Sequence, residues 1–292
     1  EDGSLFFYYA DDKDRGYIDS LDFKVDGQQV KLEYLPGNID IGKIILNKPL
    51  APGGQISITT PFHVKLPRGK ISRLGHIEQQ YQITQWYPKP AVYDKDGWQQ
   101  IPYLTQGEFY SEFGTFDVYI TLPKNYVLGS TGELIDNPEE EKFIDSVWQA
   151  TKAITKYDTK DNKFPASSTA LKTLHYHQDN VHDFAWFCDK RYHVLKGEVT
   201  LPHTGRKVTT CVMYTNRYAN LWKDGVQYIN DALFYYSKWN GDYTYDVCTA
   251  VDGALSAGGG MEYPNITVIG AVSSALTLDI VITHEVGHNW FY

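Results

Sequence analysis

The feature that most constrains this chain is the segment 284–288, which reads His-Glu-Val-Gly-His between two apolar runs. Such flanks are typical of a buried helix, where residues four apart lie on one face about one turn from each other. Two imidazoles with this spacing can bind one metal ion, and the carboxylate between them can reach a water on that ion. We therefore predict that His284 and His288 bind zinc and that Glu285 is the catalytic base. Without such partners, His and Glu side chains on a buried helix would be costly.

The overall composition narrows the class of protein. With 27 basic and 36 acidic residues the net charge is −9, which disfavours nucleic acid as a partner and leaves no basic stripe for a membrane surface. No apolar run reaches the roughly 18 residues of a transmembrane segment. The three cysteines, Cys188, Cys211 and Cys248, are too few for a disulfide framework, and at least one stays unpaired within the chain.

The first 135 or so residues predict an antiparallel β domain. Val30, Leu32 and Tyr34 alternate with polar residues, and the segment 116–120 repeats this period of two. Aromatic residues make up 15% of the chain. We interpret this enrichment as strand composition rather than as a sugar-stacking surface, because aromatic side chains suit a pleated, half-buried sheet.

The middle of the chain shows less hydrophobic periodicity. Residues 136–165 are polar and predict a solvated loop or an exposed strand pair. The alternating segment 171–177 predicts a strand on which His175 and His177 share one face, and exposed histidines are favoured there over a second metal site. Residues 181–187 indicate a buried strand.

Helix and strand patterns then follow each other towards the C-terminus. Apolar residues at helical spacing predict an amphipathic helix over 217–239 whose stripe faces the core. The segments 207–214, 243–250 and 266–269 predict strands.

A glycine-rich segment, 256–263 (Ser-Ala-Gly-Gly-Gly-Met-Glu-Tyr), precedes the histidine motif by about twenty residues. Consecutive glycines allow another backbone to approach closely, so a peptide can pair with the main chain if this is an edge strand. Glu262 can hold a cation at the end of that strand. Taken alone, the segment is explained equally well as a flexible turn with a solvated Glu.

Taken together, the two segments resemble the gluzincin aminopeptidase N family, which carries a Gly-x-Met-Glu-Asn motif shortly before its His-Glu-x-x-His helix. Residues 259–262 match that motif, and Tyr263 stands where the family usually has Asn. The segment 84–87 (Thr-Gln-Trp-Tyr) is similar to the family segment that sends a Gln into the substrate pocket, with Tyr87 in place of a second anchor. The resemblance covers nearly the whole chain.

The resemblance implies a role for each matching residue. His284 and His288 bind zinc, and Glu285 deprotonates the metal-bound water that attacks the scissile carbonyl. The implied substrate-binding residues are Gln85, Gly259, Gly260, Met261 and Glu262. Among them, Glu262 receives the free α-ammonium of the substrate. The partner is then a peptide with a free N-terminus.

Two further catalytic groups of the family lie downstream of its motif helix. Its third zinc ligand is a Glu about eighteen residues beyond the second His, and its oxyanion-stabilising Tyr follows later. We expect both beyond Tyr292, in a C-terminal part of the chain that partners this segment. The longer protein is then a zinc aminopeptidase, and the segment alone is expected to be inactive or nearly so.

The resemblance also implies the fold class, which is α+β and mostly β. Residues 1–195 are expected to form an N-terminal antiparallel β-sandwich of saddle-like shape, and residues 196–292 the first part of a thermolysin-like α/β metallopeptidase domain. The alternatives are a thermolysin-like endopeptidase, a non-catalytic binding or scaffold protein with the same fold, and a glycan-binding β domain. Export to the periplasm or the extracellular space would suit a peptide-scavenging enzyme, but the sequence does not decide the compartment.

Overall fold

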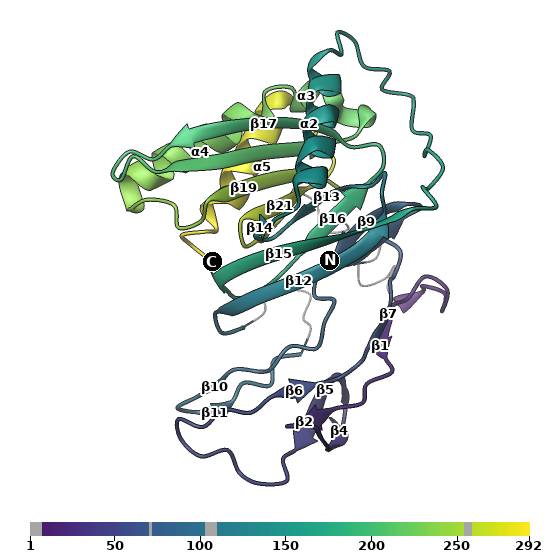
Figure 1. Ribbon diagram of the computed structural model, residues 1–292, viewed down its shortest axis with the longest axis vertical. Helices are drawn as coiled ribbons and strands as arrows, with labels where there is room; N and C mark the ends of the chain where they lie inside the picture. Colours follow the sequence, from purple (N-terminus) through teal and green to yellow (C-terminus); the bar gives the residue numbers. More distant parts are fainter. Residues whose placement is uncertain (1–7, 70–71, 103–109, 254–258) are drawn as a thin grey trace. The chain divides into compact units, whose positions relative to one another are not determined.

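The computed structural model describes residues 8–69, 72–102, 110–253 and 259–292 of the chain (Figure 1). The chain forms two compact units. Unit 1 contains residues 1–67 and 86–112, and unit 2 contains residues 68–85 and 113–292. In sequence, unit 2 therefore consists of the short segment 68–85, which interrupts unit 1, and of the chain after residue 112.

Unit 1 consists of short antiparallel strands, and its longest pair is the hairpin of β4 and β5. The alternation predicted for Val30 to Tyr34 produces β4. Among the described residues of this unit, the buried hydrophobic side chains are those of Val30 and Val92, so the unit encloses little core. Its strands are β1 (Tyr17–Asp19), β2 (Lys24–Val25), β3 (Gln28–Gln29), β4 (Lys31–Leu35), β5 (Asn38–Ile45), β6 (Ile58–Thr59), β7 (His63–Lys65), β10 (Tyr93–Asp94) and β11 (Gly97–Trp98).

The described residues of unit 2 form three sheets, with strand orders β13-β16-β9-β8, β12-β15-β14 and β17-β18-β19-β21-β20. Its strands are β8 (Gly75–Ile77), β9 (Gln80–Ile83), β12 (Gly114–Pro123), β13 (Val127–Ser130), β14 (Glu133–Leu134), β15 (Leu171–Val181), β16 (Trp186–Asp189), β17 (His193–Thr200), β18 (Lys207–Tyr214), β19 (Val247–Asp252), β20 (Gly260–Tyr263) and β21 (Ile266–Ile269). Its helices are α2 (Pro138–Lys152), the 3-10 turn η1 (Asn216–Tyr218), α3 (Ala219–Trp222), α4 (Gly225–Asn240) and α5 (Ala275–Gly287).

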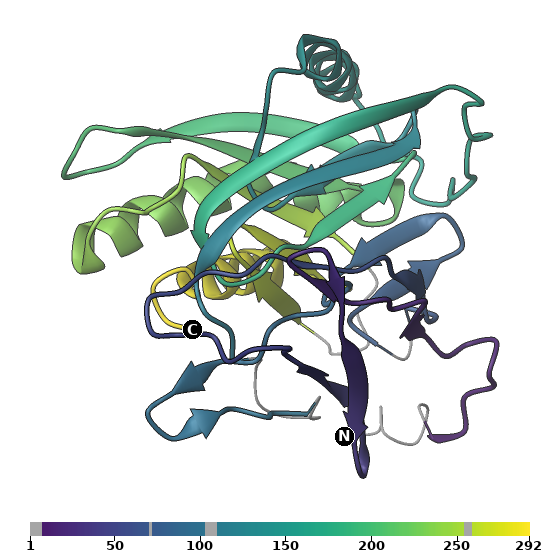
Figure 2. The same cartoon turned by 60° about the horizontal axis from the view of Figure 1, so that its bottom comes forward.

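The five-stranded sheet has helices on both faces, as Figures 1 and 2 show. Because side chains alternate along a strand, consecutive residues of one strand pack into the two different hydrophobic clusters on the two faces of the sheet. Val212 and Ala250 pack with α4 and α5, whereas Met213 and Val251 pack with α2. The central strands are parallel, β18 to β19 and β19 to β21, while β17 and β20 close the two edges in antiparallel pairing.

The prediction of a loop or strand pair over 136–165 was wrong, because α2 occupies residues 138–152. Local signals explain this helix. Asn137 caps it by accepting a hydrogen bond from the backbone N–H of Glu140 at 3.0 Å, and Pro138 stands in its first turn. Apolar residues on one face then pack against the sheet, among them Phe143 and Val147. The high charge of the segment hid this stripe.

Of the other predicted elements, two strands differ from the structure. The strand predicted at 181–187 was wrong for residues 182–185, which lie between β15 and β16, and the strand predicted at 243–250 begins only at Val247, as β19. The predicted helix 217–239 is present as η1, α3 and α4, with a break at Lys223 and Asp224. The strand predicted at 266–269 is β21, and the one predicted at 171–177 is the first part of β15. A mostly β chain with few helices is therefore confirmed, whereas the sandwich arrangement stays a prediction.

The predicted domain boundary between residues 195 and 196 also stays a prediction; strand β17 runs across both residues, which belong to unit 2. Cys188, Cys211 and Cys248 are all free thiols. Burial raises the pKa of Cys211 and of Cys248 to about 12. None of the helices in the described ranges is long and apolar enough to cross a membrane.

Candidate metal centre

Helix α5 carries the histidine motif. It begins after Ser274, whose hydroxyl accepts a hydrogen bond from the backbone N–H of Thr277 at 3.1 Å. Leu278, Ile282 and Val286 recur every four residues and bury one face of the helix against α4 and the sheet. This packing holds the C-terminal turn of α5, and with it the motif, at a defined position.

The two histidines of the motif face each other. The Nε2 atoms of His284 and His288 lie 3.2 Å apart. Two nitrogens bound to one zinc at about 2.0–2.1 Å in a tetrahedral arrangement stand about 3.4 Å apart, so this spacing fits a shared ion. The Nδ1 atom of His288 lies 2.8 Å from the carbonyl oxygen of Phe291, an acceptor that keeps the proton on Nδ1 and leaves the lone pair on Nε2.

Two carboxylates lie beside His288. Glu285 is 5% exposed, and the side chain of Glu262 is 10% exposed. A carboxylate oxygen of Glu262 lies 3.9 Å from Nε2 of His288, and ligand atoms of Glu262, Glu285 and His288 all lie within 4.8 Å of one another. Two largely buried acids beside a pair of imidazoles form a donor set that suits a divalent cation.

Strand β20 brings Glu262 to the motif. Gly260 and Glu262 face α5, while Met261 alternates to the other face and is buried in the core beneath α2. A Cβ on Gly260 would stand 2.6 Å from Cδ and 2.7 Å from Cγ of Glu285, so only glycine fits here without displacing that side chain. Among the described strands, β20 is an edge strand of its sheet, and an edge strand can pair with a further strand.

The glycine-rich segment is described from Gly259 onward; residues 256–258 lie outside the described ranges. Gly259 has a φ of 56°, a conformation that favours glycine, and its carbonyl accepts a hydrogen bond from the backbone N–H of Gly270 at 2.8 Å. This bond ties the start of β20 to the end of β21.

Gln85, at the end of the segment 68–85 of unit 2, contacts strand β20. Its side-chain amide donates to the hydroxyl of Tyr263 at 3.3 Å, and its backbone has a φ of 45°. Tyr263 is 3% exposed, and burial raises its pKa well above the ordinary range. The structure therefore brings Gln85 to the residue that follows Glu262. The predicted roles of Gln85 and Met261 in substrate binding stay predictions.

Comparison with solved structures shows what this fold is similar to. An M1 zinc metallopeptidase mutant from Deinococcus radiodurans matches 94% of this chain and 54% of its own length, at 16% identity and a TM-score of 0.56. A two-domain M1 zinc metallopeptidase mutant bound to L-arginine matches with the same coverage, at 14% identity and a TM-score of 0.55. The aminopeptidase A of Legionella pneumophila in complex with aspartic acid matches 97% of this chain and 31% of its own length, at 14% identity and a TM-score of 0.58.

The chain has the fold of the M1 zinc metallopeptidases. This agrees with the resemblance to the aminopeptidase N family drawn from the motifs. The chain spans about half the length of the Deinococcus M1 structure and about a third of the Legionella one. No protein-family model matches the sequence, and neither does any curated protein.

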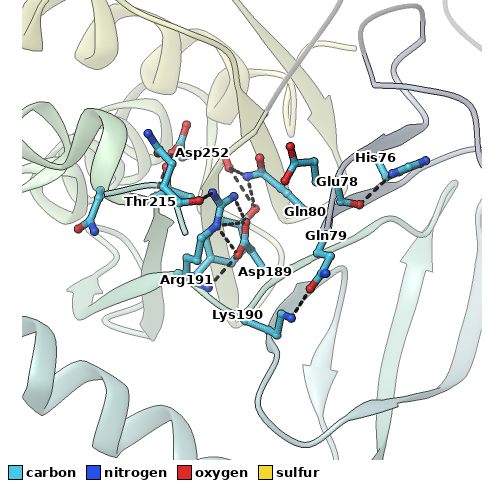
Figure 3. Close-up of polar contacts among 12 residues, drawn as sticks. His76, Glu78, Gln79, Gln80, Asp189, Lys190, Arg191, Thr215 and Asp252 are labelled. Carbon is cyan, nitrogen blue, oxygen red and sulfur yellow. Dashed lines mark hydrogen bonds and ion pairs between the residues drawn. The ribbon is translucent and has the colours of Figure 1, made fainter. Parts of the chain in front are cut away.

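A buried polar cluster lies at the end of β19 (Figure 3). Asp252, at the end of β19, accepts hydrogen bonds from the backbone N–H of Thr215 at 3.0 Å and from its hydroxyl at 2.7 Å. The backbone carbonyl of Asp252 accepts from the Gln80 amide at 3.1 Å and from the Tyr192 hydroxyl at 3.0 Å. Burial raises the pKa of Asp252 to about 6.

Sequence reasoning did not find this cluster. Its members come from four separate strands or loops, and none stands in a motif. The only signal in the sequence was an Asp just after the apolar strand predicted at 243–250, and an Asp at that place also suits an exposed turn.

The sequence did not indicate a position for Tyr292 either. The centroid of its ring lies 6.1 Å from that of His288 and 4.3 Å from that of His182.

Proposed function

We propose that this chain carries the metal-binding and N-terminus-binding elements of a zinc aminopeptidase, which releases N-terminal residues from peptides. The observation that carries this proposal is the approach of the His284 and His288 Nε2 atoms to 3.2 Å beside the carboxylates of Glu285 and Glu262. The M1 fold supports it, and so do the free amino acids in similar structures, because an amino acid is the product of such a reaction.

His284 and His288 would hold the zinc, and a third protein ligand is expected beyond Tyr292. When bound, zinc supplies a Lewis acid and lowers the pKa of a coordinated water towards neutrality. Glu285 would accept the proton of the attacking water, because its carboxylate is buried and lies within reach of the ligand atom of His288. Gly260 leaves the room that this carboxylate needs.

Glu262 would bind the α-ammonium of the substrate. A hydrogen bond to a charged group contributes about 1.5–3 kcal/mol, which corresponds to a preference of roughly ten- to a hundredfold for a free N-terminus. The main chain at Gly259 and Gly260 would pair with the substrate backbone, since β20 is an edge strand. Gln85, whose side-chain amide donates to the Tyr263 hydroxyl, would be a second residue that binds the N-terminus of the substrate.

The test uses the natural protein, with whatever sequence follows Tyr292. We expect release of an N-terminal residue from a chromogenic aminoacyl amide, and a loss of at least about a hundredfold in kcat for Glu285→Gln with zinc content retained. Asp279→Asn, an acid on the same helix, is the matched control and should keep full activity. Equal cleavage of N-acetylated peptides would instead identify a thermolysin-like endopeptidase, and absence of bound zinc would identify a non-catalytic protein with this fold.

A second variant tests the role of Glu262. Glu262→Gln should raise KM for a substrate with a free N-terminus by about tenfold or more, while the zinc content stays the same. Loss of zinc from this variant would show that Glu262 is a metal ligand, because its carboxylate lies 3.9 Å from Nε2 of His288.

A further inference from the structure

The residue that follows the motif, Asn289, links the end of α5 to the turn between β20 and β21. Its side-chain oxygen accepts a hydrogen bond from the backbone N–H of Asn265 at 3.2 Å, and its side-chain nitrogen donates to the carbonyl of Val286 at 3.0 Å. We propose that Asn289 is a positioning residue, which sets the spacing between His288 and Glu262 and makes the site selective for α-aminoacyl substrates. This inference rests on the proposed function, in which Glu262 holds the substrate ammonium.

Asn265 gives this link a fixed anchor. It is fully buried, and its φ of 50° completes the turn after Pro264, a conformation that Asn tolerates. Its side-chain oxygen accepts from the backbone N–H of Gly132 at 2.8 Å, and its side-chain nitrogen donates to the side-chain oxygen of Gln178 at 2.9 Å. Its backbone carbonyl accepts from the N–H of Thr249 at 3.0 Å. Three other segments of unit 2 therefore hold this turn in place independently of α5.

The spacing between Glu262 and His288 decides which substrates place their carbonyl at the metal centre. A carboxylate oxygen of Glu262 lies 3.9 Å from Nε2 of His288. In an α-aminoacyl group, the ammonium nitrogen and the carbonyl carbon are joined through one carbon and stand about 2.5 Å apart. A β-aminoacyl group inserts one further carbon, with a bond of about 1.5 Å. Since a displacement of about 1 Å at the reacting atoms can cost about a hundredfold in rate, a fixed spacing favours the α form.

The test compares alanyl p-nitroanilide with β-alanyl p-nitroanilide, two isomers of equal charge that differ by one carbon between the ammonium and the carbonyl. It uses the natural protein, with whatever sequence follows Tyr292, and measures the ratio of the two kcat/KM values. Asn289→Ala removes one hydrogen bond, so this ratio should fall about two- to tenfold. A merely structural defect lowers the fraction of folded or zinc-loaded protein, which changes both rates equally and leaves the ratio unchanged.

Binding gives a second readout that needs no hydrolysis. In a Glu285→Gln background, calorimetry measures the affinities of alaninamide and β-alaninamide for the zinc-loaded protein. We expect alaninamide to bind more tightly, and adding Asn289→Ala should lower the affinity ratio by about the same two- to tenfold. Asn289→Asp keeps an oxygen acceptor for the Asn265 N–H, so it should retain most of the natural ratio in both measurements.

Asn125→Ala is the matched control. Asn125 also joins two backbone groups, since it accepts from the N–H of Ser168 at 2.9 Å and donates to the carbonyl of Ala166 at 2.8 Å, but it lies between β12 and β13. This variant should lose stability and keep both ratios. Ratios that Asn289→Ala leaves unchanged would overturn the positioning role, and so would an equal fall in Asn125→Ala. The proposed function fails separately, if the natural protein binds the two amides and hydrolyses neither p-nitroanilide.

Discussion

Asp252 gives the most quantitative prediction, because its carboxyl is buried and its charge is poorly compensated. The residue is 4% exposed, and burial raises its pKa from an ordinary value of 3.8 to about 6, against the opposing effect of its hydrogen bonds from Thr215. Replacing it by Asn keeps an oxygen acceptor for Thr215 and removes the titration. We expect Asp252→Asn to be more stable than the natural chain above neutral pH.

The sign and size of this pH-dependent stability difference follow from the linkage between proton binding and folding. Since the folded chain binds this proton more tightly than the unfolded chain, the stability that protonated Asp252 contributes is fully present below pH 3.8 and is lost as the pH rises through about 6. A shift of about two pKa units corresponds to about 3 kcal/mol. The difference in unfolding free energy between Asp252→Asn and the natural chain should therefore increase by about 2.5 kcal/mol between pH 4 and pH 8, since part of the effect lies below pH 4.

Urea denaturation at each pH unit from 4 to 8 measures this difference. The exposed Asp231 on α4 provides the control, since Asp231→Asn should shift the unfolding free energy by no more than about 0.5 kcal/mol at any pH. A stability difference for Asp252→Asn that does not change with pH would refute the reasoning. So would an Asn variant that is less stable than the natural chain at pH 8.

Two further substitutions test packing in unit 2. Gly260→Ala places a methyl group against the Glu285 carboxyl, where 2.6 Å is available to Cδ, so we expect a stability loss of about 1–3 kcal/mol in thermal unfolding; an unchanged Tm would show that Glu285 moves aside freely. Glu140→Ala leaves the Lys172 ammonium buried without the carboxylate that it contacts at 2.7 Å through both oxygens, and should cost about 3–5 kcal/mol in urea unfolding. Replacing both residues, as Glu140→Leu with Lys172→Met, should recover most of that loss. A double variant that loses as much stability as Glu140→Ala would contradict this account.

Several elements could be predicted because their determinants are local. The spacing of His284 and His288 places them on one helix face whatever the tertiary structure, and the apolar period from 217 to 239 marks the helix η1–α4 in the same way. Helix α2 was missed although its signals, Asn137 as cap and Pro138 in the first turn, are equally local. Its three consecutive Glu residues and weak apolar stripe favoured a loop on composition, while packing against the sheet stabilised the helix.

The sequence by itself left the segment of Glu262 open between an edge strand and a flexible turn. It did determine the candidate metal-binding pair, His284 and His288, because the helix period acts over a few neighbouring residues. Only the tertiary structure decided which groups meet that pair. Gly260 touches Glu285 because the chain order places β20 at the edge of the sheet beside α5, and Gln85 reaches Tyr263 across 178 positions of sequence. The raised pKa of Asp252 likewise has no local cause, since it arises from the layers that exclude water from the end of β19. Contacts of this kind depend on strand order and burial, which no short window of sequence contains.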